Sequence, residues 1–207
     1  MKIGIVACDI LKREVEFLTK DDPDFTERIY LEFALHTDPP AMREKIIESV
    51  NGLKGKVDAV FLGYATCNSL EGVLDVLQVP TAMLDGADCI GALLGSDEYA
   101  RQKKICIGTW FSSPGWAEEG IDGLVKELHL DSAEGYEPQF FLDMIFESYQ
   151  RTLFIDPGIG DAETYRKESK DFSDTVHLKL DCTKCSLDNF RDAIKRAKEL
   201  ALEARAS

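Results

Sequence analysis

The chain alternates between short runs rich in β-branched residues and stretches in which apolar residues recur at helical spacing. A turn signal follows each run. Parallel strands need a crossover connection, usually a helix, so this alternation is typical of a parallel α/β fold. The sequence therefore predicts a three-layer α/β fold, with a mostly parallel sheet of about seven strands and helices on both faces. The expected strands are 2–6, 29–35, 58–63, 80–84, 104–109, 152–155 and 176–180.

Helices are expected between these strands and after the last one. Asp38 is a candidate N-cap and Pro39 suits the first helical position, so a helix should follow the second strand. Residues 117–150 form a long, mostly helical insertion, and a charged helix from 187 to about 204 ends the chain. No repeat or linker is visible. We therefore expect residues 1–207 to form a single α/β domain.

The charge balance excludes several classes of partner. Asp and Glu number 38 against 24 Lys and Arg, which gives a net charge of -14. This excess repels phosphates, so neither a nucleic acid nor an anionic membrane is an expected partner. No apolar run approaches the roughly 18 residues of a membrane helix, and the apolar start is too short for an export signal. We expect a soluble, cytoplasmic protein.

The positions of the six cysteines are the most informative functional feature. In a chain without an export signal, cysteines are more often free thiols, metal ligands or catalytic groups than disulfides. Ligands of open α/β sheets bind beyond the carboxyl ends of the strands. Five cysteines and one histidine follow predicted strands, whereas Cys106 falls inside one, where a buried, inert thiol is expected. The residues at strand ends are Cys8, His36, Cys67, Cys89, Cys182 and Cys185.

Thiolates and imidazole are the ligands that zinc prefers, and thiolates also hold iron–sulfur clusters. Cys8, His36, Cys67 and Cys89 would converge from four loops as a Cys3His-like centre. A structural zinc would fill all four positions, whereas a catalytic zinc would leave one open. Two alternatives remain. The cysteines could pack beneath loops with His36 as a capping residue, or Cys67 or Cys89 could be a metal-free reactive thiol at a helix N-terminus.

Two further groups of residues are candidates for auxiliary roles. Cys182 and Cys185 form a CxxC motif that is expected to open a helix, which suggests an auxiliary metal or redox site or an incidental surface pair. Trp110 and Trp116 flank a predicted loop that could be a lid or a substrate wall; hydrophobic packing is the alternative. Together with Asn68 they are the candidate substrate-binding residues.

Several common nucleotide and hydrolase motifs are absent from the sequence. There is no GxGxxG after the first strand, no GxxxxGK[ST] and no GxSxG. Dinucleotide-binding, P-loop and α/β-hydrolase functions therefore lose their main support.

Five short segments resemble an uncharacterised family of archaeal and anaerobic bacterial proteins, catalogued as domain of unknown function 1638. They are Ala7 to Glu14, Ala34 to His36, Gly63 to Asn68, Asp88 to Ser96 and Ser113 to Trp116. The typical family form has Cys-Gly-Asn after the third strand, where this chain has Cys67-Asn68-Ser69. The Cys182/Cys185 pair is not a feature associated with the family.

The resemblance implies a cytoplasmic α/β protein of unestablished activity. Members often accompany corrinoid-dependent methyltransferase systems, which suggests one-carbon or methylamine metabolism. The leading expectation is a protein with a thiolate-rich zinc or iron–sulfur centre which, if it is an enzyme, transfers a methyl group to a metal-activated thiol. The alternatives are an accessory protein that contacts a corrinoid protein or methyltransferase, so that corrinoid comes only with the partner, and a metal-free thiol enzyme.

Overall fold

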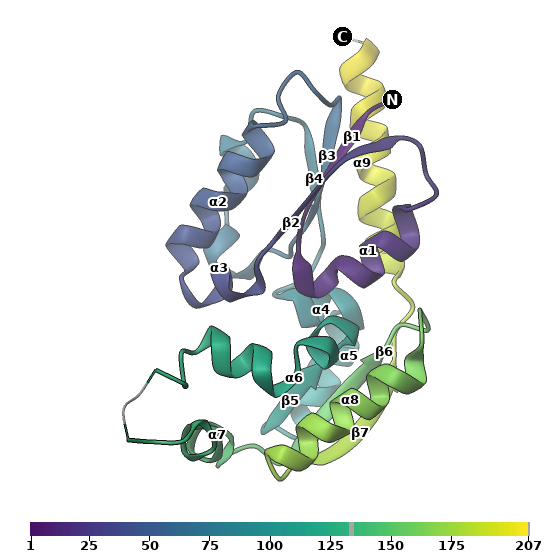
Figure 1. Cartoon of the computed structure of the whole chain (residues 1–207). Helices are drawn as coiled ribbons and strands as arrows, with labels where there is room; N and C mark the ends of the chain where they lie inside the picture. Colours follow the sequence, from purple (N-terminus) through teal and green to yellow (C-terminus); the bar gives the residue numbers. More distant parts are fainter. Residues whose placement is uncertain (133–134, 207) are drawn as a thin grey trace. The chain divides into compact units, whose positions relative to one another are not determined.

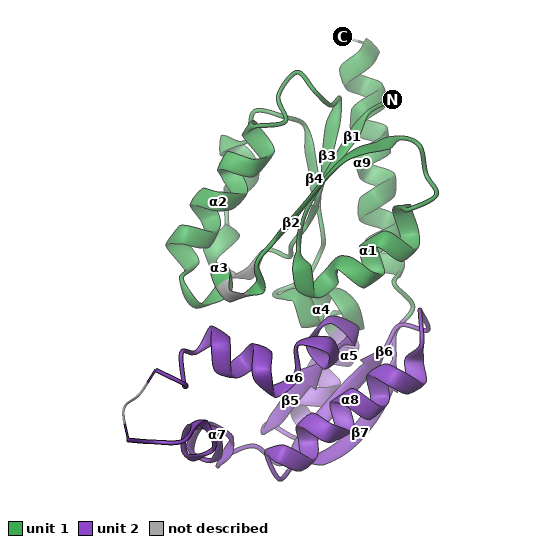
Figure 2. Ribbon diagram, viewed as in Figure 1, with its two compact units in different colours: residues 1–96, 186–207 green, residues 97–185 purple. Residues whose placement is uncertain are grey.

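The computed structural model describes residues 1–132 and 135–206, with the side chains of residues 34, 67 and 68 outside that description. The predicted α/β class is confirmed, because seven strands are flanked by helices and every strand pair is parallel. The strands form two sheets, of four and three strands, instead of one. The chain divides into two compact units, Met1–Ser96 with Ser186–Ser207 (unit 1) and Asp97–Cys185 (unit 2) (Figure 2).

The sheet of unit 1 has the order β2-β1-β3-β4. Its strands are β1 (Ile3–Cys8), β2 (Phe25–Leu31), β3 (Ala59–Gly63) and β4 (Thr81–Met83). The chain moves from β1 to β2 on one side and continues through β3 to β4 on the other. The strand order therefore reverses between β1 and β3, at the position where open α/β sheets bind ligands. Both strands are almost wholly buried, as their continuous apolar sequences predict.

Helices cover both faces of this sheet. Figure 1 shows α1 (Lys12–Thr19) and α9 (Asp188–Ala206) on one face, with α2 (Pro39–Asn51) and the short α3 (Cys67–Leu70) on the other. The remaining helix, α4 (Cys89–Leu94), contacts α9. The predicted cap of α2 is confirmed, because the Asp38 carboxylate accepts a hydrogen bond from the Ala41 N–H at 3.1 Å. Short 3₁₀ turns occur at Asp9–Leu11, Phe33–Thr37 and Val73–Val76.

The sheet of unit 2 has the order β5-β6-β7. Its strands are β5 (Thr109–Ser112), β6 (Arg151–Asp156) and β7 (Lys179–Lys184), and its helices are α5 (Ser96–Ile105), α6 (Pro114–Glu127), α7 (Pro138–Phe146) and α8 (Ala162–Thr175). An aromatic cluster fills one side. The indole of Trp110 stacks on Phe172, with ring centroids 5.6 Å apart, and meets Phe146 edge-on at 5.2 Å. These contacts join β5 to α7 and α8.

The buried guanidinium of Arg151 links β5, β6, β7 and α5. It donates to the Thr109 hydroxyl at 3.0 Å, to the Gln102 side-chain oxygen at 2.8 Å and to the Asp181 carboxylate at 3.1 Å. Strand residues alternate between faces, so Arg151 points to the opposite side of the sheet from Thr152 and Phe154.

Three predicted strands differ from the structure. The strand expected at 176–180 is Lys179–Lys184, because Val176 caps the end of α8 and its N–H donates to the Phe172 carbonyl at 3.2 Å. The second strand is Phe25–Leu31 and not 29–35. Arg28 and Tyr30 donate hydrogen bonds to Glu16 on α1, so the sequence of this edge strand is polar and lacks the apolar pattern used for the prediction. The predicted strand 104–109 is wrong. Residues up to Ile105 belong to α5, which the Glu98–Arg101 pair stabilises at spacing i,i+3, and β5 begins only at Thr109.

Cys106 therefore lies just after α5 and not inside a strand. Its half-buried thiol lies 3.6 Å from the side-chain oxygen of Gln150. The predicted loop between Trp110 and Trp116 is also corrected, since it consists of the end of β5 and the start of α6. The expected helical insertion at 117–150 holds most of α6 and all of α7.

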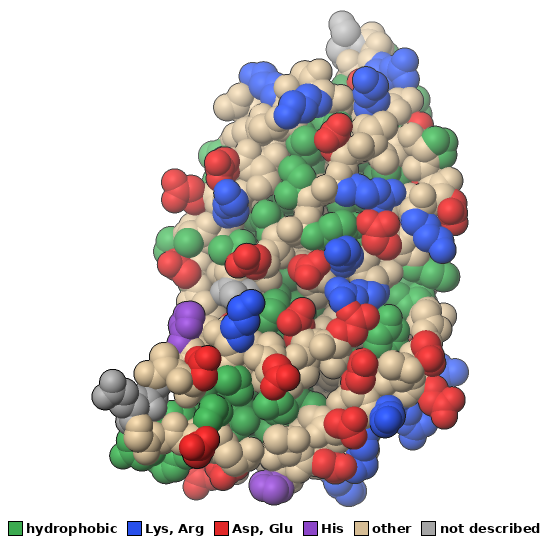
Figure 3. Space-filling view, viewed as in Figure 1, with side chains coloured by type: hydrophobic (Ala, Val, Ile, Leu, Met, Phe, Trp, Pro, Cys, Tyr) green, Lys and Arg blue, Asp and Glu red, His purple; other side chains and the backbone are tan. Residues whose placement is uncertain are grey.

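The two signs of charge are mixed on the face that Figure 3 shows. On the face that Figure 3 shows, Lys and Arg are interspersed with Asp and Glu, and they form no continuous basic area there. None of the helices within residues 1–132 and 135–206 combines the length and apolar character needed to cross a bilayer.

Candidate functional site

Cys8 and Cys89 approach each other at the carboxyl edge of the sheet in unit 1. Cys8 is the last residue of β1 and packs partly against the core on the α2 side of the sheet. Cys89 is the first residue of α4, which follows β4. The two thiols are close enough for the charge of an ionised Cys8 to act on Cys89. Cys8 and Cys89 thus lie within electrostatic range of each other.

The surroundings of Cys89 favour the protonated thiol. Burial, together with the negative charges of Cys8 and Asp88, raises the pKa of Cys89 to about 12. The expected stabilisation of a Cys89 thiolate by the helix N-terminus is therefore wrong, because desolvation outweighs the N-terminus of this six-residue helix. A bound cation would reverse the balance, since it compensates the charges of both thiolates.

The loop after β4 holds Cys89 at a fixed position. The Asp88 carboxylate caps α4 by accepting a hydrogen bond from the Gly91 N–H at 2.7 Å. Gly86 has a φ of 140°, and a Cβ there would lie 2.9 Å from the backbone nitrogen of Ala92. Glycine therefore allows this loop to pass against the first turn of α4.

Cys67 is the first residue of α3, directly after the loop that follows β3. The side chains of Cys67 and Asn68 lie outside the described residues. The backbone before them is joined to the loop that carries Cys89, since the Thr66 N–H donates to the Gly86 carbonyl at 3.2 Å. The Leu84 N–H also donates to the Tyr64 carbonyl at 3.1 Å. The segments leading to Cys67 and Cys89 therefore run side by side.

Gly63 brings the Cys67 loop close to β1. It lies opposite Ala7, the residue before Cys8, in the parallel pairing of β1 and β3. A Cβ at Gly63 would lie 2.5 Å from the Ala7 Cβ, well inside van der Waals contact. The absence of a side chain here permits the close approach of the two strand ends that carry Cys8 and Cys67.

His36 lies in the 3₁₀ turn Phe33–Thr37, five residues beyond the end of β2, and its side chain is exposed. Its Nδ1 is 2.6 Å from the Phe33 carbonyl, which can only accept, so Nδ1 carries the proton and a neutral ring has its lone pair on Nε2. Among the described side chains, no three His, Cys, Asp or Glu groups are placed to hold a metal together. His36 thus forms no such group with Cys8 and Cys89.

The CxxC motif does not open a helix, which corrects the prediction. Cys182 lies within β7, Cys185 follows that strand, and α9 begins only at Asp188. The Cys185 N–H donates to the Asp156 carbonyl at 3.0 Å, so the extended backbone continues to Cys185. Side chains three residues apart in a strand point to opposite faces, about 10 Å apart along it. This geometry does not join the two sulfurs in one metal or redox site.

The two tryptophans pack together in unit 2. Their ring centroids are 5.5 Å apart, and Trp110 is surrounded by Phe146, Tyr149 and Phe172. These contacts agree with the packing alternative for Trp110 and leave no open loop to act as a lid.

Glu14 is a buried acid that the sequence analysis did not single out. Its side chain is fully buried in α1, and neither carboxylate oxygen has a hydrogen-bond partner among the described residues. Burial raises its pKa to about 7. The spacing of Glu14 indicates its burial in the sequence, because it lies three residues after Leu11 and one before Val15, on the apolar side of the helix.

Comparison with known proteins identifies a family without a described activity. No curated protein and no solved structure matches the chain. Residues 30–194 match the model of a family described as protein of unknown function (DUF1638), a range that includes His36, Cys67 and Cys89. The chain therefore belongs to the DUF1638 family.

Proposed function

We propose that unit 1 binds a transition-metal centre, zinc or iron–sulfur, through the thiolates of Cys8, Cys67 and Cys89. The observation that carries the proposal is that Cys8, at the end of β1, lies near enough to Cys89, at the start of α4, for its negative charge to raise the pKa of the Cys89 thiol. The two residues follow strands on either side of β3, and Cys67 follows β3 itself. The three cysteines thus lie at or just beyond the ends of three adjacent strands, beside the reversal of strand order.

The chemistry of the donor set fits such a centre. Zinc and iron–sulfur clusters are bound by deprotonated cysteine, and the charge of the metal offsets the repulsion that keeps neighbouring thiols protonated. The raised pKa of Cys89 is the result expected for a thiolate ligand considered without its cation. A fourth coordination position on the metal would be left for an exogenous ligand, or for His36 if the turn that carries it moves.

The same observation weighs against a metal-free thiol enzyme that uses Cys89. A cysteine nucleophile needs an appreciable thiolate fraction at working pH, and a pKa of about 12 leaves almost none. A neighbouring negative charge from Asp88 or Cys8 has the opposite effect to that of an activating histidine or lysine.

We further propose a role in corrinoid-linked one-carbon metabolism in the cytoplasm, on the basis of the family resemblance. Metal binding keeps a sulfur deprotonated but nucleophilic, which suits a thiol that accepts a methyl group. In this proposal the corrinoid belongs to a partner protein. Affinity purification from the native host should recover a corrinoid protein or a methyltransferase; recovery of neither would exclude the stable partner but not the metal centre.

Elemental analysis of anaerobically purified protein tests the metal centre. We expect about one equivalent of zinc, or the iron and sulfide of one cluster, per chain. A brown chromophore would identify the cluster, and zinc without absorbance would identify a zinc site. Less than about a tenth of an equivalent of any transition metal would contradict the proposal, because a structural thiolate site binds tightly.

Cysteine variants assign the ligands. Cys8→Ser, Cys67→Ser and Cys89→Ser should each lower the metal content, whereas Cys106→Ser and Cys182→Ser should retain it because both residues lie in unit 2. Equal metal content in all five variants would show that any bound metal lies elsewhere. Chelators should lower the melting temperature of the wild type but not that of Cys89→Ser.

A further inference from the structure

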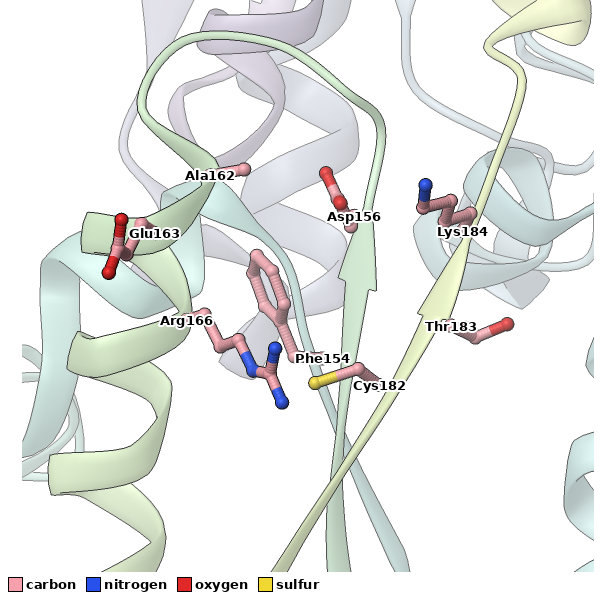
Figure 4. Close-up of a pocket in the computed structure, with 8 residues that line it drawn as sticks. All are labelled: Phe154, Asp156, Ala162, Glu163, Arg166, Cys182, Thr183 and Lys184. Atoms are coloured by element: carbon pink, nitrogen blue, oxygen red, sulfur yellow. The ribbon is translucent and has the colours of Figure 1, made fainter.

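Unit 2 contains a pocket of about 470 Å³ at the carboxyl ends of β6 and β7 and the start of α8. Its floor is the buried ring of Phe154, and four charged side chains line it together with the thiol of Cys182 (Figure 4). The pocket is formed entirely within unit 2. It is therefore separate from the thiolate site proposed for unit 1.

The charges in this pocket do not neutralise one another. Arg166, Lys184, Asp156 and Glu163 line it, and none of the four makes an ion pair with any residue the structure describes. Other charges on the same elements do pair, as Lys170 does with Asp174 on α8 and Arg151 with Asp181 across β6 and β7. Arg166, Lys184 and Glu163 are exposed and are therefore accessible to a ligand from solvent.

The charged groups surround the apolar floor, with one acid and one base on each side of it. Asp156 and Lys184 are register partners at the ends of β6 and β7, and Glu163 and Arg166 lie on α8. Figure 4 shows the Arg166 guanidinium beside Cys182, with Phe154 between this cation and the Asp156 carboxylate. The Gly158 N–H donates to Asp156 Oδ1 at 2.8 Å, which fixes the orientation of that carboxylate. Guanidinium binds carboxylates in a planar fork, and a carboxylate accepts hydrogen bonds from an ammonium group.

We propose that this pocket binds a small zwitterion, an amino acid or a related molecule carrying both a carboxylate and an ammonium group. Arg166 binds the carboxylate, and Asp156, on the other side of Phe154, receives the ammonium group. Glu163 and Lys184 complete the charged rim of the pocket. A simple anion would meet the two carboxylates without compensation, and a simple cation would meet the two basic side chains. A ligand with both charges satisfies Arg166 and Asp156 together.

Cys182 provides a reporter within the pocket. Its exposed thiol is a lining group, so a bound ligand covers it. The experiment measures the rate at which iodoacetamide, a neutral reagent, alkylates Cys182 in the full-length protein, with the site identified by peptide mass spectrometry. The nineteen standard amino acids other than cysteine, whose thiol would consume the reagent, are the test ligands. Acetate and methylamine at the same concentrations carry each charge alone.

We expect at least one amino acid to slow alkylation of Cys182 about tenfold at ten times its dissociation constant, by mass action. Acetate and methylamine should leave the rate unchanged. Arg166→Gln, Lys184→Gln and Asp156→Asn should weaken protection, whereas Lys167→Gln, an exposed change on α8 outside the pocket, should keep it. The proposal is overturned if no amino acid protects Cys182, if acetate or methylamine protects equally well, or if none of the pocket variants weakens protection.

Discussion

Cys8 and Cys89, at the end of β1 and the start of α4, form an electrostatically coupled pair in which the charge of one thiolate raises the pKa of the other. Neither residue has a sequence neighbour that would indicate this relationship. Their proximity follows from the strand order of unit 1, which places the ends of β1, β3 and β4 at one edge.

The coupling predicts how Cys89 reacts in metal-free protein. Cys8→Ser removes the neighbouring charge and lowers the pKa of Cys89, so alkylation of Cys89 near pH 10 should accelerate by about two- to tenfold. Asp88→Asn should act in the same direction while keeping the cap of α4. Peptide mass spectrometry after timed iodoacetamide treatment measures the rate, with Cys182 as the internal control. An unchanged Cys89 rate in both variants would refute the coupling.

Glu14 predicts a pH-dependent contribution to stability. Its pKa is about 7 in the folded protein against 4.5 for an unperturbed side chain, so between these values the folded state binds more protons than the unfolded state. The free energy of unfolding therefore falls as pH rises above about 4.5. The fall ends above about pH 7, where Glu14 is ionised in both the folded and the unfolded state.

Glu14→Gln mimics the protonated form and should remove this loss. The free energy of unfolding of the variant, relative to wild type, should rise by about 2.5 kcal/mol between pH 5 and pH 8. Urea titrations at the two pH values measure this change, and Glu44→Gln on the exposed side of α2 is the control. A difference that is constant with pH would show that Glu14 does not titrate in this range.

Arg151 and Asp181 should contribute unequally to stability although they form one ion pair. Arg151→Ala removes hydrogen bonds to Gln102 and Thr109 as well as to Asp181, and should lower the free energy of unfolding by about 3 kcal/mol. The side chain of Asp181 is 45% exposed, so Asp181→Ala should cost about 1 kcal/mol or less. Equal losses in urea denaturation would show that the ion pair alone accounts for the effect.

Gly63→Ala should destabilise the β1–β3 pairing by about 1–3 kcal/mol, because its Cβ would clash with Ala7. If Cys8 and Cys67 share a metal, its content should fall too. The double variant Ala7→Gly/Gly63→Ala relieves the contact and should recover part of both losses. Gly55→Ala is a control for the effect of backbone conformation. A Cβ at Gly55 would meet no neighbour, so any loss of stability reflects its φ of 76°. Additive losses in the double variant would contradict a direct clash.

The sequence predicted those elements that local chemistry specifies. Asp38 and Pro39 mark the start of α2, and the continuous apolar run of β3 marks a strand buried on both faces. The placement of Cys8, Cys67 and Cys89 after strands was also accessible, because turn signals follow β1, β3 and β4 within a few residues.

Local patterns failed where the environment of a segment decided its structure. Residues 104–109 resemble a strand through Ile105 and Ile107, yet α5 continues to Ile105, and the side chain of Ile107 is 93% exposed. The CxxC motif resembles a helix start, but Cys182 pairs with Phe154 in the parallel register of β6 and β7. Long-range strand pairing outweighed the local motif.

By itself, the sequence determined the α/β class, the parallel strands and the presence of thiols at their ends, since periodicity and turn residues act within a few positions of the chain. Only the tertiary structure decided that the strands form two sheets and that Cys8 lies within electrostatic range of Cys89. It also decided that Glu14 is buried with no hydrogen-bond partner among the described residues, and that four charged side chains line one pocket. These features depend on which distant segments pack together, and burial and charge interactions between them are not encoded in local spacing.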